Sequence, residues 1–183
     1  MANPLDIYVI YKFIRILATP FKETDAYKLG IIDEKGKILR KRKDLTTKEE
    51  KKANTVLHTL VWKLKRVLDK IPFVRSKLGS FAAALWLIKE ETGVDQKLLE
   101  DSFMNFLLEN NPSAHAEITR MTLLESTFKS PTIPAGTYSL LKRPSGGEKK
   151  LIIEHSIEPI GRSLGIPVYK YKDMLFTQYD IKG

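Results

Sequence analysis

The sequence predicts an α+β protein with a mainly helical body at residues 1–128 and a small β-rich module at residues 129–183. Apolar residues recur at helical spacing through most of the first 128 residues. Beyond residue 130, proline, glycine and β-branched residues separate short apolar runs, which favours strands. With 183 residues, of which 43% are hydrophobic and 29% charged, the chain is long enough for one domain with a real core, or for one helical domain plus a small appendage.

Residues 5–21 are strongly apolar and predict a buried helix. The set expected to face inward is Ile7, Ile10, Phe13, Ile14 and Leu17, with Lys12 and Arg15 on the opposite face. The longest uninterrupted apolar run is far shorter than the roughly 20 residues that span a bilayer. No small-residue cleavage site follows, so we expect neither a transmembrane segment nor a signal peptide. A basic amphipathic anchor at a membrane surface and a strand remain alternatives.

Residues 27–43 predict a basic β-hairpin. Asp33-Glu34-Lys35-Gly36 separates two short runs of β-type residues, and Gly36 would supply the positive φ angle of the turn. A run of four cations, 40–43, therefore lies on or just after the second strand.

A capping box formed by Thr47 and Glu50 predicts the start of a long helix. One apolar stripe runs from Ala53 to Ile71, and Pro72 marks the expected end. Further helices are expected at 76–93, with Gly93 as its C-terminal stop, at 96–111 after the capping residue Asp95, and at 113–128.

The last 55 residues predict a small antiparallel sheet or partly closed barrel of SH3-like size. Strands are expected within 136–143, 151–155, 166–173 and 174–181, with a hairpin turn at 144–150 and an irregular link at 156–165. Because such a module has little core of its own, we expect it to pack against the helical body.

The net charge of +9 is unevenly distributed. Residues 35–77 contain fifteen Lys or Arg and four acidic residues, a net of +11, whereas residues 78–128 contain three and eight, a net of −5. The cationic face is a solvated surface, a phosphate-binding surface or a docking patch for an acidic protein, and the opposite charges also allow self-association.

For the phosphate-binding interpretation, the expected contact residues are Arg40, Lys41, Arg42, Lys43, Lys48, Lys51 and Lys52. The amides at the following helix start could face the same phosphate. Aromatic residues are missing from the run 40–43, so single-strand recognition by an OB or RRM type of surface is not indicated. Contacts would be to the nucleic-acid backbone and largely indifferent to sequence.

No pattern indicates catalysis. The three histidines, His58, His115 and His155, lie in three different expected elements, and there is no cysteine, so a thiolate metal site is excluded. We therefore predict a non-enzymatic protein with no catalytic residues, cofactor or metal.

The stretches "TPFKETDAYKLGIID", "EEKKA" and "SFAAALWLIKE", within the first half of the chain, resemble a protein of large tailed bacteriophages of the T-even-like and marine cyanophage type. The resemblance implies a virion or head-assembly component, located in the virion or the host cytoplasm. Its partners would be other virion or assembly proteins, with DNA as a further partner and no membrane. The alternative is a free, sequence-nonspecific nucleic-acid-binding protein.

Overall fold

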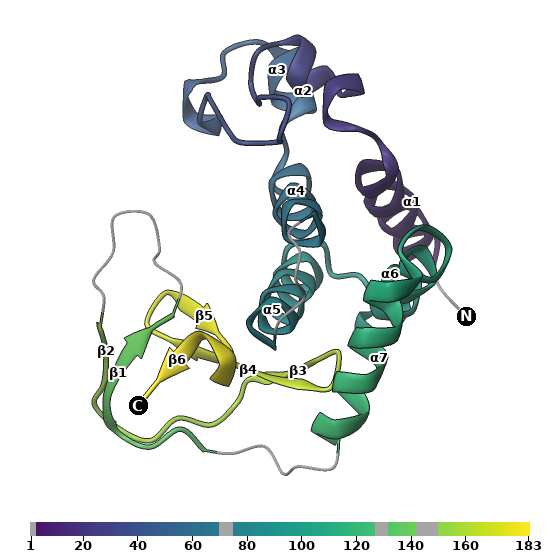
Figure 1. Cartoon of the computed structure of the whole chain (residues 1–183). Helices are drawn as coiled ribbons and strands as arrows, with labels where there is room; N and C mark the ends of the chain where they lie inside the picture. The colour runs from purple at the N-terminus through teal and green to yellow at the C-terminus, as the bar shows by residue number, and fades with distance from the viewer. Residues whose placement is uncertain (1–2, 70–74, 127–131, 142–149) are drawn as a thin grey trace. The chain divides into compact units, whose positions relative to one another are not determined.

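The computed structural model describes residues 3–69, 75–126, 132–141 and 150–183 and confirms the α+β class (Figure 1). The helices are α1 (Pro4–Ala18), α2 (Asp25–Lys28), α3 (Lys48–Ala53), α4 (Val56–Leu68), α5 (Arg75–Thr92), α6 (Gln96–Asn110) and α7 (Pro112–Ser126). Short 3-10 turns lie at η1 (Phe21–Glu23), η2 (Arg42–Asp44) and η3 (Gln178–Asp180). The strands are β1 (Gly136–Leu140), β2 (Lys150–Ile153), β3 (Gly161–Ser163), β4 (Ile166–Tyr171), β5 (Met174–Phe176) and β6 (Ile181–Lys182).

The contacts of the chain divide it into two compact units. Unit 1 comprises Met1–Ile71 and Leu87–Phe106, and unit 2 comprises Pro72–Trp86 and Leu107–Gly183, so α5 and α6 contribute to both. The predicted boundary near residue 129 lies outside the described residues and stays a prediction.

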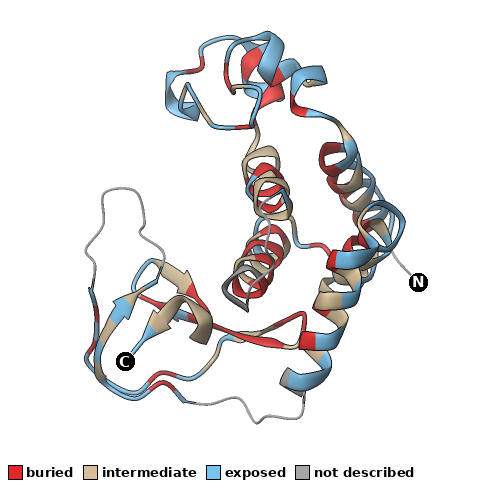
Figure 2. Cartoon of the chain, viewed as in Figure 1, coloured by how far each residue is buried: buried red, intermediate tan, exposed pale blue. Residues whose placement is uncertain are grey.

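Helix α1 is present as predicted, but its inward face is rotated from the expected one. Its buried residues are Asp6, Val9, Phe13, Ile16 and Leu17, whereas Ile7 is exposed and Ile10 and Ile14 are half-buried. Figure 2 shows that α1 has a buried and an exposed side. Asp6 explains the rotation, because its carboxylate accepts the Asn3 amide in a capping box and also the amide of Asp95, which precedes α6. A carboxylate that caps its own helix and bonds another must face inward, so Ile7 faces outward.

The predicted hairpin at 27–43 is shorter than expected. Tyr27 and Lys28 are helical in α2, and only Ile32 and Ile38 form an antiparallel bridge. The turn between them is closed by Asp33, whose Oδ1 accepts the amides of Lys35 and Lys37 at 2.9 and 2.8 Å. Gly36 has the predicted positive φ of 72°, and a Cβ there would overlap with the Phe21 ring.

The single long helix predicted from residue 47 is two helices, α3 and α4. The capping box of Thr47 and Glu50 is confirmed, but the chain leaves helical geometry at Asn54, with φ −136° and ψ 76°. Thr55 then starts α4 with a second capping box, in which His58 takes the role usually held by Glu or Gln. The apolar spacing continues across this break, which is why periodicity alone did not show it. The predicted end at Ile71 and Pro72 lies outside the described residues.

The next three helices follow the prediction closely. Gly93 ends α5 with φ +71°, and its amide donates to Lys89 O at 2.8 Å. Asp95 caps α6, since its Oδ1 accepts the Leu98 amide at 2.8 Å. Asn111 caps α7 in the same way through Ala114.

The strands form two antiparallel three-stranded sheets with the orders β2-β1-β6 and β3-β4-β5. The 3-10 turn η3 leads into the last strand, β6, which pairs with the first strand, β1. Strand β3 lies inside the segment predicted as an irregular link. The predicted turn at 144–150 lies, except for Lys150, outside the described residues. Buried residues from both sheets, together with the isolated bridge of Ile133 and Ile157, form one apolar cluster: Ile133, Leu151, Ile153, Ile157, Tyr169, Tyr171 and Phe176.

Within unit 2, the strands pack against helices, as predicted for a small β module. Helix α7 contacts β4. Gly79 of α5 lies so close to the fully buried Thr177 that a Cβ would overlap with its hydroxyl oxygen. Gly161 of β3 lies equally close to the ring of Trp86. Two glycines therefore set the separation between α5 and the β segment.

Candidate polyanion-binding surface

The predicted contact residues lie on a short connection and on the helix that follows it, all within unit 1. Arg40 precedes Lys41, the N-cap of η2, while Arg42 and Lys43 belong to η2. The others, Lys48, Lys51 and Lys52, are on α3. Leu45, which lies between the two groups in sequence, is buried.

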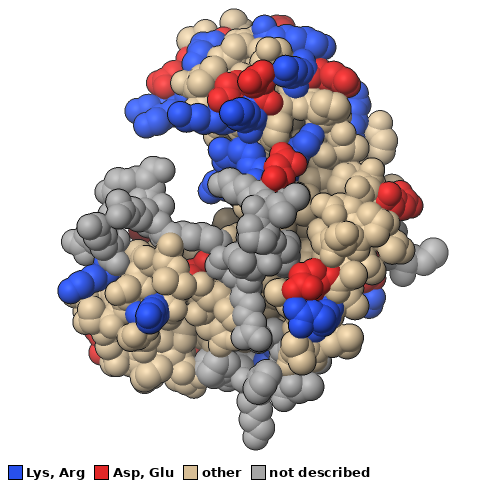
Figure 3. Space-filling model, in the orientation of Figure 1, with Lys and Arg blue, Asp and Glu red and all other residues tan. Residues whose placement is uncertain are grey.

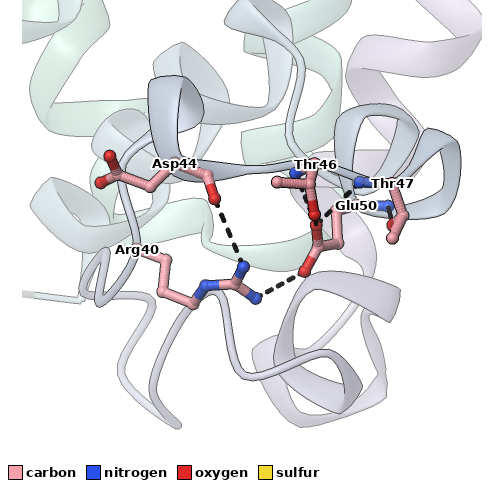
Figure 4. Close-up of polar contacts among 5 residues, drawn as sticks. All are labelled: Arg40, Asp44, Thr46, Thr47 and Glu50. Atoms are coloured by element: carbon pink, nitrogen blue, oxygen red, sulfur yellow. Dashed lines mark hydrogen bonds and ion pairs between the residues drawn. The ribbon is translucent and has the colours of Figure 1, made fainter.

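Arg40 differs from the other six cations because its guanidinium is bonded within the protein. Its Nη1 donates to Glu50 Oε1 at 2.6 Å, and its Nη2 lies 3.5 Å from the carbonyl oxygen of Asp44 (Figure 4). Glu50 is buried, so this ion pair ties the start of the cationic run to α3. The pair is ten residues apart and matches no local sequence pattern, so sequence inspection could not show it.

The other carboxylate oxygen of Glu50 closes the helix start. Oε2 accepts the amides of Thr46 and Thr47 at 2.9 and 3.1 Å, while the Thr47 hydroxyl accepts the Glu50 amide at 3.1 Å. The two backbone amides and then the Arg40 guanidinium lower the pKa of Glu50 to about 2, so it is ionised at neutral pH. Three amides at this helix start are thus bonded within the protein: those of Thr46 and Thr47 to the Glu50 carboxylate, and that of Glu50 to the Thr47 hydroxyl.

The other six predicted contact residues are all exposed, and we call them the six free cations: Lys41, Arg42, Lys43, Lys48, Lys51 and Lys52. Throughout the described ranges, none of the six side chains forms an ion pair or hydrogen bond. In Figure 3, Lys and Arg side chains gather over the end of unit 1 that holds η2 and α3, with some acidic side chains between them. Their uncompensated charge, on a backbone held by the Arg40–Glu50 pair, suits a polyanion.

The histidines are not brought together. His58 lies on α4, His115 on α7 and His155 just after β2, and among the described residues no three His, Cys, Asp or Glu side chains are placed to hold a metal ion. His58 has a structural partner instead: its Nδ1 lies 2.8 Å from the Thr55 hydroxyl and 3.4 Å from the Thr55 amide. An amide can only donate, so Nδ1 must be unprotonated to accept it.

We expect this cap to make stability sensitive to mild acid. Burial, and next the nearby Lys12 ammonium, lower the pKa of His58 to about 4 from a usual 6.5, while Asp25 opposes the shift. The unfolded chain then binds the proton more readily than the folded one, so stability is complete above about pH 6.5 and is lost as the pH falls toward 4. Allowing for partial exposure of the ring, the free energy of unfolding should fall by roughly 1–2 kcal/mol between pH 7 and 5.

His58→Gln tests this directly, because glutamine can accept the Thr55 amide without titrating. Urea unfolding at pH 7, 6 and 5 should show a flatter pH dependence for His58→Gln than for the wild type. His115→Gln, which removes a histidine outside any cap, is the matched control. Equal slopes for the wild type and His58→Gln would show that the cap does not titrate in this range.

Comparisons with known proteins give no match: no protein-family model, curated protein or solved structure is similar to the chain. Of the helices in the described ranges, none is long and apolar enough to cross a membrane.

Proposed function

We propose that the protein is a non-enzymatic structural or head-assembly protein of a tailed bacteriophage, and that its six free cations bind the backbone of DNA. The phage assignment is supported by the resemblance in the first half of the sequence. The binding assignment is supported by one observation above others: six exposed cations have no acidic partner among the described residues and are carried by one short, capped segment.

The composition of the surface favours contacts that ignore base sequence. Five of the six free cations are lysines, whose ammonium groups act as point charges, whereas reading of guanine edges relies chiefly on bidentate arginine. Helix α3 has only six residues, and no other regular element lies between residues 41 and 53 except the 3-10 turn η2. The expected contacts are therefore to phosphates, with an affinity that falls steeply with salt.

Charge reversal at Arg42 and Lys43 tests the proposal, because both are exposed and neither holds the fold. Binding of a random 20-base-pair duplex would be measured at several salt concentrations for the wild type and for Arg42→Glu/Lys43→Glu. Loss of two phosphate contacts should reduce the slope of log K against log salt by about 1.8 and weaken binding at every salt concentration. Arg40 is left unchanged, since reversing its charge would set two carboxylates against each other at Glu50.

The matched control is Lys170→Glu/Lys182→Glu, which makes the same change in net charge at two exposed lysines of β4 and β6. It should leave the salt slope near the wild-type value. An equal loss in both variants would mean that only net charge matters and that the six free cations are not a site. Absence of DNA binding at the lowest salt would reject DNA as the ligand and turn the search to an acidic assembly protein.

The location in the phage cycle is tested separately from DNA binding. A structural component should co-purify with particles or proheads in a fixed copy number, measured by quantitative mass spectrometry of banded particles. A free, sequence-nonspecific nucleic-acid-binding protein, the alternative, should be found in the lysate and vary in amount from one particle preparation to another.

A further inference from the structure

The outward face of α1 carries aromatic and cationic side chains together. Tyr8 and Tyr11 are 55% and 60% exposed, and Lys12 and Arg15 are exposed as well. Counted from Tyr8, the other three residues follow after three, four and seven positions, which places all four side chains on one side of the helix. This side is turned away from the buried residues of α1 (Figure 2).

The same face has no exposed carboxylate to balance its charge. Asp6 is the only acidic residue of α1, and it is buried on the other side, where it accepts the amides of Asn3 and Asp95. The Lys12 ammonium lies 4.7 Å from the centroid of the Tyr8 ring. In the part of the chain that the structure describes, neither Lys12 nor Arg15 forms an ion pair.

We propose that this face of α1 binds single-stranded nucleic acid, with Tyr8 and Tyr11 stacking on unpaired bases and Lys12 and Arg15 neutralising the adjacent phosphates. Every base has an aromatic face, so stacking on tyrosine is indifferent to sequence and is closed to a duplex, whose bases already stack on one another. The cations supply what a purely apolar face would lack, namely complementarity to a polyanion.

A second copy of the chain fits this face less well. A symmetric pairing of two α1 helices would bring Lys12 and Arg15 of both copies together with no exposed acid on either helix to offset them. A single strand of nucleic acid offers bases that can stack on the tyrosine rings and phosphates that offset the charges of Lys12 and Arg15.

The inference rests on the proposed function and extends it. The six free cations and the α1 face belong to the same compact unit, but the cationic run itself has no aromatic residue. The α1 face would add aromatic rings for stacking. Unit 1 would then bind duplex DNA through the six free cations, and strands with unpaired bases would bind more tightly because they also stack on α1.

The test compares a fluorescent 20-nucleotide thymidine oligomer with a 20-base-pair duplex by anisotropy, using the full chain. Tyr8→Ala/Tyr11→Ala should weaken binding of the oligomer about tenfold or more and leave binding of the duplex unchanged. Tyr8→Phe/Tyr11→Phe keeps both rings and should retain the wild-type affinity. The matched control, Leu5→Ala/Ile7→Ala, trims two equally exposed apolar side chains of the same helix and should affect neither ligand.

The outcomes separate this inference from the proposed function. Loss of oligomer binding only in the Tyr→Ala pair supports the α1 site, even if Arg42→Glu/Lys43→Glu leaves duplex binding intact and so rejects the proposed function. Unchanged oligomer affinity in the Tyr→Ala pair overturns the α1 site. Equal loss in the Leu5/Ile7 control also overturns it, and would indicate an apolar docking face for a protein or a lipid surface. Circular dichroism of each variant confirms that the helix is intact.

Discussion

Phe103→Ala is expected to lower the free energy of unfolding by roughly 3–5 kcal/mol, which is a large share of the stability of an ordinary domain. Phe103 is fully buried on α6, and its ring centroid lies 6.4 Å from that of Phe13 on α1, with the rings tilted by 60°. Truncation removes this aromatic contact and leaves a cavity between two helices of unit 1 that are far apart in sequence.

Urea unfolding followed by circular dichroism measures the loss. The matched control is Leu108→Ala on the same helix, because Leu108 is 53% exposed and its truncation should change stability by no more than about 0.5 kcal/mol. Comparable losses in the two variants would show that Phe103 is not packed in the core against Phe13.

Gly161→Ala should be the most damaging single-methyl change in unit 2, with a loss of roughly 1–3 kcal/mol. A Cβ at this position would overlap with atoms Cη2 and Cζ3 of Trp86 and lie 3.2 Å from Cζ2. An indole ring cannot bend away as a flexible side chain can, so either the ring or strand β3 must move.

A double-mutant cycle identifies the cause. Trp86→Leu removes the ring atoms in question, so the loss from Gly161→Ala should be much smaller in a Trp86→Leu background. Gly136→Ala is the control within the same unit, since a Cβ there would meet only Tyr138 at 3.5 Å, an ordinary contact. Additive losses at positions 161 and 86 would contradict the clash.

The helices were largely predictable because their signals are local. The predicted caps at Asp95 and Thr47 and the stop at Gly93 each involve residues no more than four apart, and the structure has all three. The break at Asn54 was missed, since the apolar stripe continues through it. A histidine in the capping box of α4 also carries no pattern that sequence inspection would assign to a helix start.

Features that depend on distant residues were predicted less well. The face that α1 buries is set by the contact between Asp6 and the amide of Asp95, 89 residues away, and apolar spacing alone selected Ile7 instead. Strand β3 has only three residues and is defined by its pairing with β4, not by its own composition. The site shows the same limit, because only the fold shows that Arg40 is bonded to Glu50 while its neighbours are free.

The Arg40–Glu50 pair also constrains how the sequence can vary. A change at position 40 that removes the guanidinium leaves a buried carboxylate without its cation, so it should be accepted in related chains mainly when position 50 changes as well. Lys41 and Lys43 have no such partner in the described part of the chain and can exchange with arginine without a compensating substitution. An alignment of relatives should therefore show covariation of positions 40 and 50 inside a basic run whose other members vary independently.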